Sequence, residues 1–329
     1  MTPRRLLLRR RPWLLALLIA GVALAAWINV PLPLRPFDGS ADRVRALPAL
    51  GAFRAGQRVL VLSPHPDDET LCCAGMIQQA RAAGAEVWIT WVTAGDGFEF
   101  DAALTERVLR PGAQNMRDLG AARVLEARAA AQILGVPRDH TFVLGYPDRG
   151  LARLTTSNVV RPYTAPRTAA SAVYVAGALT PGAPYTGQAL DADLNRVLDT
   201  VRPDVVLAPA PQDFHTDHRT LALLSIRLMA QRGQEDRLRF WVVHGGVEWP
   251  VPKGLHETLP LTIPPRGRTL VWERANLTPA EVARKWEAVQ AYRTQTRVLG
   301  RFMEAFVRRN ELLSPEVPDP NPTREPAVP

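Results

Sequence analysis

The chain has 329 residues, 47% of them hydrophobic, and a formal net charge of +8. This length and apolar content allow one large globular domain, or two small ones, with a substantial core. The positive charge comes almost entirely from arginine, since lysine occurs only at Lys253 and Lys285, and no basic stripe is interleaved with aromatic residues. Nucleic-acid binding is therefore not expected.

The amino-terminal 30 residues combine an arginine-rich start with an apolar run over residues 13–28. This pattern predicts a transmembrane signal anchor or a signal peptide, and the small residues at 23–25 offer a cleavage pattern that would lead to secretion. We favour the anchor, because the apolar run continues beyond that pattern. The positive-inside rule then predicts a single-pass protein of the cytoplasmic membrane, with the arginines in the cytoplasm and the remaining chain outside it.

The rest of the chain divides into a proline-rich tether (31–46), a domain (47–313) and a proline-rich, disordered tail (314–329). Strands alternate with helices in the domain, which predicts an α/β fold with a mostly parallel sheet and helices on both faces. The expected strands are residues 58–62, 86–93, 141–144, 204–209 and 239–244, and the expected helices are residues 70–80, 117–134, 193–201, 220–228, 279–292 and 297–312.

A first polar cluster directly follows the first strand, where residues 64–69 read Pro-His-Pro-Asp-Asp-Glu. His65, Asp67 and Asp68 would lie at the carboxyl end of a strand, where open α/β sheets bind ligands. One imidazole and two carboxylates are also side chains that commonly bind metal ions together. The alternative is that the two aspartates only cap the next helix. Glu69 is expected to cap that helix or to steady the turn.

A second cluster, residues 211–219, also follows a strand and opens a helix. It carries His215, Asp217 and His218, so three of the six histidines of the chain lie in these two turns. In a parallel sheet both turns would lie at the same edge, where the two clusters can meet. The spacing of the two histidines places them on one helix face, and the alternative is a surface pair.

Residues 151–188 carry no clear period and are interpreted either as a lid or substrate-binding loop or as a plain surface excursion. Cys72 and Cys73 are adjacent and are interpreted as small buried side chains rather than as a disulfide or metal ligands. The remaining histidines are interpreted as structural or solvated: His140, His244 and His256.

These motifs resemble those of the LmbE-like, or PIG-L, family of zinc-dependent de-N-acetylases. Residues 64–69 match its His-Pro-Asp-Asp-Glu signature, and residues 215–218 resemble its His-x-Asp-His signature. Residues 119–126 and 145–148 resemble its helix and loop signatures in the same order, and the resemblance covers roughly residues 55–312. It implies a Rossmann-like (LmbE-like) fold and a hydrolase that releases acetate from an N-acetylated amino sugar, such as a GlcNAc-type glycan or glycoconjugate.

By this resemblance His65, Asp68 and His218 would hold one Zn²⁺, although Fe²⁺ or another divalent ion suits the same ligands. Asp67 would be the general base toward the metal-activated water. Asp213 stands where some members of the family place a tyrosine that assists catalysis, so the resemblance assigns this residue no role.

Further roles follow from the same resemblance. His215 would stabilise the oxyanion or protonate the leaving amine, and Asp217 would orient His215. Arg123 and Asp148 would contact the hydroxyls of the sugar, and the alternative for Arg123 is a plain helical ion pair with Glu126.

Two other functions stay open from the sequence. One is a non-catalytic, sugar-binding envelope protein on the same scaffold, against which the retained Asp67 argues, because binding alone needs no base beside a metal. The other is an amidase that acts on a non-sugar amide. The expected partners are an N-acetylated sugar or glycoconjugate and, through the amino-terminal helix, the membrane.

Overall fold

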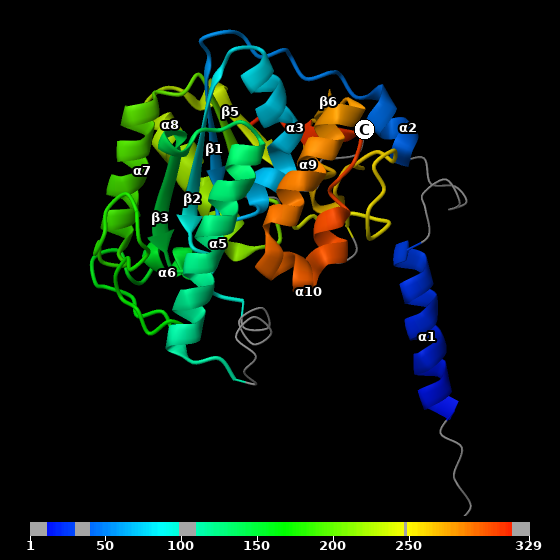
Figure 1. Cartoon of the computed structure of the whole chain (residues 1–329), viewed down its shortest axis with the longest axis horizontal. Coiled ribbons are helices and arrows are strands. Elements are labelled where there is room, and N and C mark those ends of the chain that lie inside the picture. The colour runs from blue at the N-terminus through cyan, green and yellow to red at the C-terminus, as the bar shows by residue number, and fades with distance from the viewer. Residues whose placement is uncertain (1–11, 30–39, 99–109, 247–248, 318–329) are drawn as a thin grey trace, which may run out of the picture.

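The computed structural model describes residues 12–29, 40–98, 110–246 and 249–317. At its centre lies a five-stranded parallel sheet in the order β3-β2-β1-β4-β5 (Figure 1). The strand order reverses between β1 and β4, and ligands of open α/β sheets bind at such a switch point. The strands are β1 (Arg58–Ser63), β2 (Glu86–Thr93), β3 (Thr141–Tyr146), β4 (Val205–Pro209) and β5 (Leu238–Trp241).

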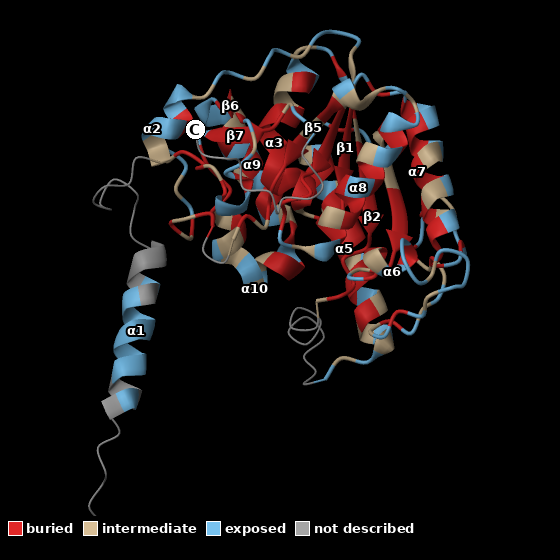
Figure 2. Cartoon of the chain, turned by 180° about the vertical axis from the view of Figure 1, so that it is seen from behind, coloured by how far each residue is buried: buried red, intermediate tan, exposed pale blue. Residues whose placement is uncertain are grey.

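Helices cover both faces of this sheet. In β1, Val59 and Val61 belong to one core cluster, and Leu60 and Leu62 to the other, because successive side chains of a strand point to opposite faces. Buried residues accordingly fill the sheet and the inner helix faces (Figure 2). The predicted mostly parallel α/β architecture is confirmed. The first cluster is closed by α3 (Asp68–Ala82), α5 (Ala113–Ile133) and α9 (Pro279–Ala291), and the second by α7 (Gly187–Val201) and α8 (Thr216–Ala230).

The predicted helix over residues 297–312 is partly wrong. Helix α10 (Arg293–Glu304) ends early, and β7 (Asn310–Leu313) pairs antiparallel with β6 (Glu273–Asn276), which the sequence did not predict. All four residues of β7 are buried, so tertiary pairing overrides the local helical pattern. The remaining elements are α1 (Pro12–Asn29), α2 (Ser40–Ala46), α6 (Leu151–Leu154), η2 (Arg138–His140), η3 (Glu235–Arg237) and η4 (Pro265–Gly267).

The predicted membrane anchor is not supported. Among the described residues, none of the helices is long and apolar enough to cross a membrane. Helix α1 stands apart from the sheet (Figure 1) and has 18 residues. The prediction of a single-pass protein of the cytoplasmic membrane is therefore wrong.

The domain limits stay a prediction. Most of the expected tether and residues 318–329 of the expected tail lie outside the described residues, while residues 40–46 form α2. Ser314, placed in the tail by the sequence, is buried and its backbone pairs with Phe240.

The two adjacent cysteines differ in one respect from the prediction made from the sequence. Cys72 and Cys73 are buried, as expected, but they are joined by a disulfide, which the sequence did not predict.

The irregular segment 151–188 packs on the second core cluster through residues such as Leu154 and Tyr185. From this segment Tyr174 donates a hydrogen bond to Asp96 at 2.6 Å. The segment therefore packs against the rest of the domain.

Candidate metal centre and active site

The turn from β1 into α3 is built around a buried carboxylate. Glu69 is fully buried, and its Oε2 accepts hydrogen bonds from Asp67 N (3.3 Å), Trp91 Nε1 (2.9 Å) and Ser63 Oγ (3.2 Å). Asp67 adopts a φ of 132°, which L-residues rarely do, so the turn needs such support. Glu69 thus steadies the turn, in agreement with one of its two predicted roles.

Three donor atoms converge at the switch point. Asp68 Oδ2 lies 3.1 Å from His65 Nδ1 and 3.1 Å from His218 Nε2, and the two ring nitrogens are 3.3 Å apart. For tetrahedral zinc with bonds of about 2.0–2.1 Å, two ligand atoms lie about 3.3–3.4 Å apart. All three side chains are buried. Their donor atoms therefore fit one ion of this class, with a position left for water or substrate.

The second ring nitrogen of His65 faces two carboxylates. Its Nε2 lies 3.2 Å from Asp148 Oδ1 and 3.3 Å from Asp217 Oδ2. Asp217 also accepts from Arg149 N at 2.6 Å, and Asp148 from Gly97 N at 2.9 Å. Carboxylates in this place fix the ring so that the other nitrogen faces the metal. Burial opposes the charged ring, but Asp148 and Asp217 outweigh it and hold the pKa of His65 well above its usual value.

This arrangement corrects the role predicted for Asp217. Its carboxylate lies against His65, not against His215, while its backbone N–H donates to His215 Nδ1 at 3.2 Å. The reason is geometric: His215 is the N-cap of α8, whereas Asp217 stands inside the first turn and faces the β1 side. Asp148, predicted to contact sugar, is likewise engaged with His65.

His218 is held from its other side by Asp213. The distance from His218 Nδ1 to Asp213 Oδ2 is 3.2 Å, and the same oxygen accepts from Val243 N and His244 N, each at 3.0 Å. Burial acts against both charges, but their attraction raises the pKa of His218 to about 10 and holds that of Asp213 below its usual range. Asp213 thus has a supporting role that the sequence did not assign.

Asp67 lies beside the donor set but is held differently. Its Oδ2 accepts a hydrogen bond from Gln295 Nε2 at 2.6 Å and lies 3.6 Å from Arg123 NH2. Burial raises the pKa of Asp67 to about 7, the charge of Asp68 adds to this effect, and Arg123 opposes it. A carboxylate that titrates near neutrality is suited to act as a general base.

Arg123 connects two loops under the site. Its guanidinium donates to the backbone oxygens of Gly95 and, at 3.1 Å, of Pro66. The side chain is buried and lines the pocket beside Asp67. A contact between Arg123 and a sugar hydroxyl stays a prediction.

His215 presents a neutral ring. Its Nδ1 accepts from Asp217 N, so the proton of the neutral imidazole resides on Nε2. Burial lowers the pKa of His215 to about 2, and the charges of His65 and His218 add to the effect. A neutral N–H donor favours oxyanion stabilisation over proton delivery to the amine.

Sequence reasoning missed two more residues of the site. The ring of His244 lies 4.8 Å from that of His218, and its position directly beyond β5 offered the same strand-end signal as the other histidines. Gln295 comes from α10, and no local motif marks it.

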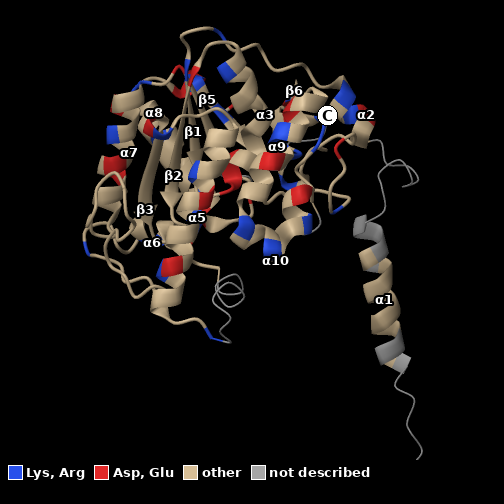
Figure 3. Cartoon of the chain, viewed as in Figure 1, with Lys and Arg blue, Asp and Glu red and all other residues tan. Residues whose placement is uncertain are grey.

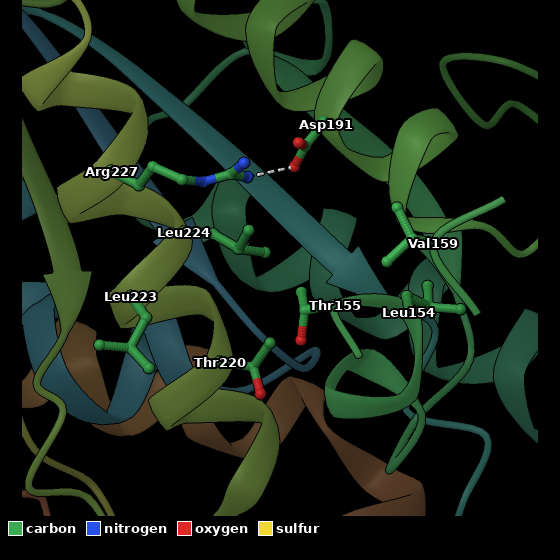
Figure 4. Close-up of a pocket in the computed structure, with 9 residues that line it drawn as sticks. Leu154, Thr155, Val159, Asp191, Thr220, Leu223, Leu224 and Arg227 are labelled. Atoms are coloured by element: carbon green, nitrogen blue, oxygen red, sulfur yellow. Dashed lines mark hydrogen bonds and ion pairs between the residues drawn. The ribbon is translucent and has the colours of Figure 1, made fainter. Parts of the chain in front are cut away.

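The pocket over these residues has a volume of about 150 Å³. A larger pocket, of about 400 Å³, lies between α6, α7 and α8 (Figure 4). Its polar groups are already paired, since Arg227 binds Asp191 at 2.6 Å and Thr220 Oγ1 binds the backbone of Thr216. The smaller pocket is therefore the candidate active site. Its walls combine polar residues that include His65, Asp67 and His215 with the apolar side chains of Leu71, Phe98, Val243, Leu299 and Phe302.

Fold and site together define a doubly wound α/β protein with a His-Asp-His donor set at its switch point. The chain belongs to the PIG-L family: the family model described as GlcNAc-PI de-N-acetylase matches residues 60–229. This confirms the resemblance seen in the motifs.

Curated relatives carry the name 1D-myo-inositol 2-acetamido-2-deoxy-alpha-D-glucopyranoside deacetylase. The protein of Mycolicibacterium smegmatis is 28% identical over 209 residues, which is 60% of this chain and 57% of the relative. That of Actinosynnema mirum is 39% identical over 93 residues, which is 28% of this chain and 31% of the relative. The chain thus spans less than two thirds of the length of either relative.

The solved structure of the antimicrobial reagent A40926 pseudoaglycone deacetylase Dbv21 aligns with a TM-score of 0.52 and 19% identity. The alignment covers 79% of this chain and 96% of that chain. At this identity the likeness shows a shared fold alone.

Proposed function

We propose that the protein removes the acetyl group from an N-acetylated amino sugar with the help of one divalent ion held by His65, Asp68 and His218. The observation that carries the proposal is the triangle of donor atoms, with edges of 3.1, 3.1 and 3.3 Å. Zinc is the first candidate, and Fe²⁺ suits the same ligands. Membership in the PIG-L family and the deacetylase names of the relatives support the reaction.

When bound, the ion would polarise the amide carbonyl and acidify a water molecule. Asp67 takes a proton from this water molecule while the oxygen of the water forms the new bond to the acetamide carbon. His215 donates its Nε2–H to the carbonyl oxygen, which becomes negative in the transition state. Asp67 then passes the proton to the amine nitrogen as the C–N bond breaks, and acetate and the free amine result.

The supporting residues act through this set. Asp148 and Asp217 hold the ring of His65, and Asp213 holds that of His218. We assign Arg123 and Asp148 a further contact with the hydroxyls of the sugar, because both line the pocket. The small pocket suits a single acetamido ring, with any larger glycan or lipid portion outside it.

The test is acetate release by the zinc-loaded full chain from a panel of N-acetylated mono- and oligosaccharides. We expect release by the wild type and release slowed by about 10²–10⁴-fold in Asp67→Ala. Release by Asp67→Ala at the wild-type rate would refute the role of the base. Release from simple N-acyl amides alone would replace the sugar by a non-sugar substrate, and no release at all would favour the non-catalytic, sugar-binding alternative.

A further inference from the structure

An amide from a distant helix reaches the proposed base. Gln295 lies on α10, is 1% exposed, and its Nε2 is 2.6 Å from both Pro66 O and Asp67 Oδ2. A backbone carbonyl can only accept, so the nitrogen and not the oxygen of the amide must stand at this place. The orientation of the side chain is therefore fixed by chemistry.

The contacts of the Asp67 carboxylate fall on one oxygen. Gln295 at 2.6 Å and Arg123 at 3.6 Å both approach Oδ2. Within the described part of the chain, Oδ1 has no hydrogen-bond partner. One oxygen is thus anchored while the other is available, and the carboxylate lines the pocket, where it can meet water.

The helix that carries Gln295 is itself fixed. Thr294 donates to Glu126 of α5 through its backbone nitrogen (3.0 Å) and its hydroxyl (2.7 Å). The Oε1 of Gln295 is buried and has no partner among the described residues. A buried acceptor without a partner is unfavourable. The two hydrogen bonds that Nε2 donates therefore offset this cost and hold the side chain in position.

We infer that Gln295 is a positioning residue for Asp67. It anchors Oδ2 and so turns Oδ1 toward the pocket as the atom that takes the proton of water. The inference rests on the proposed function, in which Asp67 is the base. Without the amide, the carboxylate rotates about its terminal torsion and spends less time in the productive orientation.

The first test replaces Gln295 by methionine, which keeps the length and packing of the side chain but donates no hydrogen bond. Gln295→Met should lower kcat about tenfold or more, with little change in KM and one metal per chain, because the ligands are untouched. Thr296→Ala, on the same helix, loses only a hydroxyl bound to its own helix backbone and serves as the control. Wild-type kcat in Gln295→Met would overturn the inference.

A double-mutant cycle separates this role from a purely structural one. In the Asp67→Ala background, Gln295→Met should leave the residual rate unchanged within about twofold, because its target is already absent. A further tenfold loss there would show that Gln295 does not act through Asp67 and would overturn the inference.

Failure of the proposed function would be visible separately, as absence of acetate release by the wild type. Crystal structures of the wild type and Gln295→Met then decide the positioning role alone. A rotated or disordered Asp67 carboxylate in the variant supports it, and an unchanged carboxylate overturns it.

Discussion

Two neighbouring carboxylates, Asp67 and Asp68, illustrate how position separates chemical roles at the scale of single residues. Burial acts to raise both pKa values, but the charge of His218 outweighs it for Asp68 and holds that pKa well below its usual range. Asp67 has no such partner at hydrogen-bond distance, and its pKa rises to about 7. Adjacent groups whose pKa values are pushed apart are typical of an acid–base site.

The first prediction follows from this separation. Asp67→Ala should retain one metal per chain and lose about 10²–10⁴-fold in turnover, the usual contribution of general acid–base catalysis. His218→Ala should lose metal and activity together, because it removes a donor atom of the triangle. Metal analysis of both purified variants beside acetate release checks the pair; a metal-free Asp67→Ala protein would contradict it.

A second prediction concerns Asp213. Asp213→Asn should weaken metal affinity by about 10–100-fold, the usual effect of removing a supporting partner of a ligand histidine. The measurement is competition for zinc against a chelator of known affinity. Asp139→Asn, an exposed change remote from the donor set, is the matched control. Equal affinities of the two variants would show that Asp213 does not support the site.

At the scale of elements, a buried ion pair ties helix α3 to its neighbours. Lys285 of α9 and Glu311 of β7 are both fully buried and lie 2.7 Å apart. Glu311 also accepts from the backbone of Gly75 and Met76 at 2.9 Å, and Lys285 donates to the carbonyl of Leu71 at 2.8 Å. The amino-terminal half of the helix that begins with Asp68 is thus held in place through Leu71, Gly75 and Met76.

The third prediction is the cost of breaking this pair. Lys285→Met leaves the charge of Glu311 buried without its partner and should lower the free energy of unfolding by roughly 3–5 kcal/mol. Lys285→Met combined with Glu311→Gln should recover part of that loss, since the charge is then gone. Denaturant unfolding of the three proteins measures both effects, and equal stability of the single variant and the wild type would contradict the prediction.

At the scale of the whole molecule, the site is a product of the complete fold. Its residues lie at the ends of β1, β3, β4 and β5 and on α5 and α10. Helix α10 also carries basic side chains (Figure 3), and its Arg293, Arg297 and Arg301 are exposed. Because no single segment supplies the donor set, metal should bind the folded chain far better than the unfolded one.

The fourth prediction expresses this coupling. Free zinc at 100 times its dissociation constant should stabilise the fold by about 2.7 kcal/mol and raise Tm by several degrees. A chelator should reverse the shift, and His218→Ala should show none. Thermal unfolding with and without zinc checks it; an equal shift in His218→Ala would place the binding elsewhere.

The strands and clusters that were predicted correctly are those that a local residue pattern defines. The bounds of β2 agree with the predicted strand over residues 86–93, and both strand-end clusters meet as expected. Strands β6 and β7 were missed because each has four residues and is defined by its distant partner. The carboxylate of Asp217 and the amide of Gln295 act across the fold, so no spacing rule indicates which group they contact.

The reversal of strand order between β1 and β4 also sets when the site can appear during synthesis. His65 and His218 are separated by 153 positions in the chain, so His65 and Asp68 leave the ribosome long before their partner. Pairing of β4 with β1 must close this long loop, a step with a high entropic cost that slows folding. A growing chain that ends before His218 thus holds at most two of the three donors, and tight binding of metal requires that β4 has paired with β1.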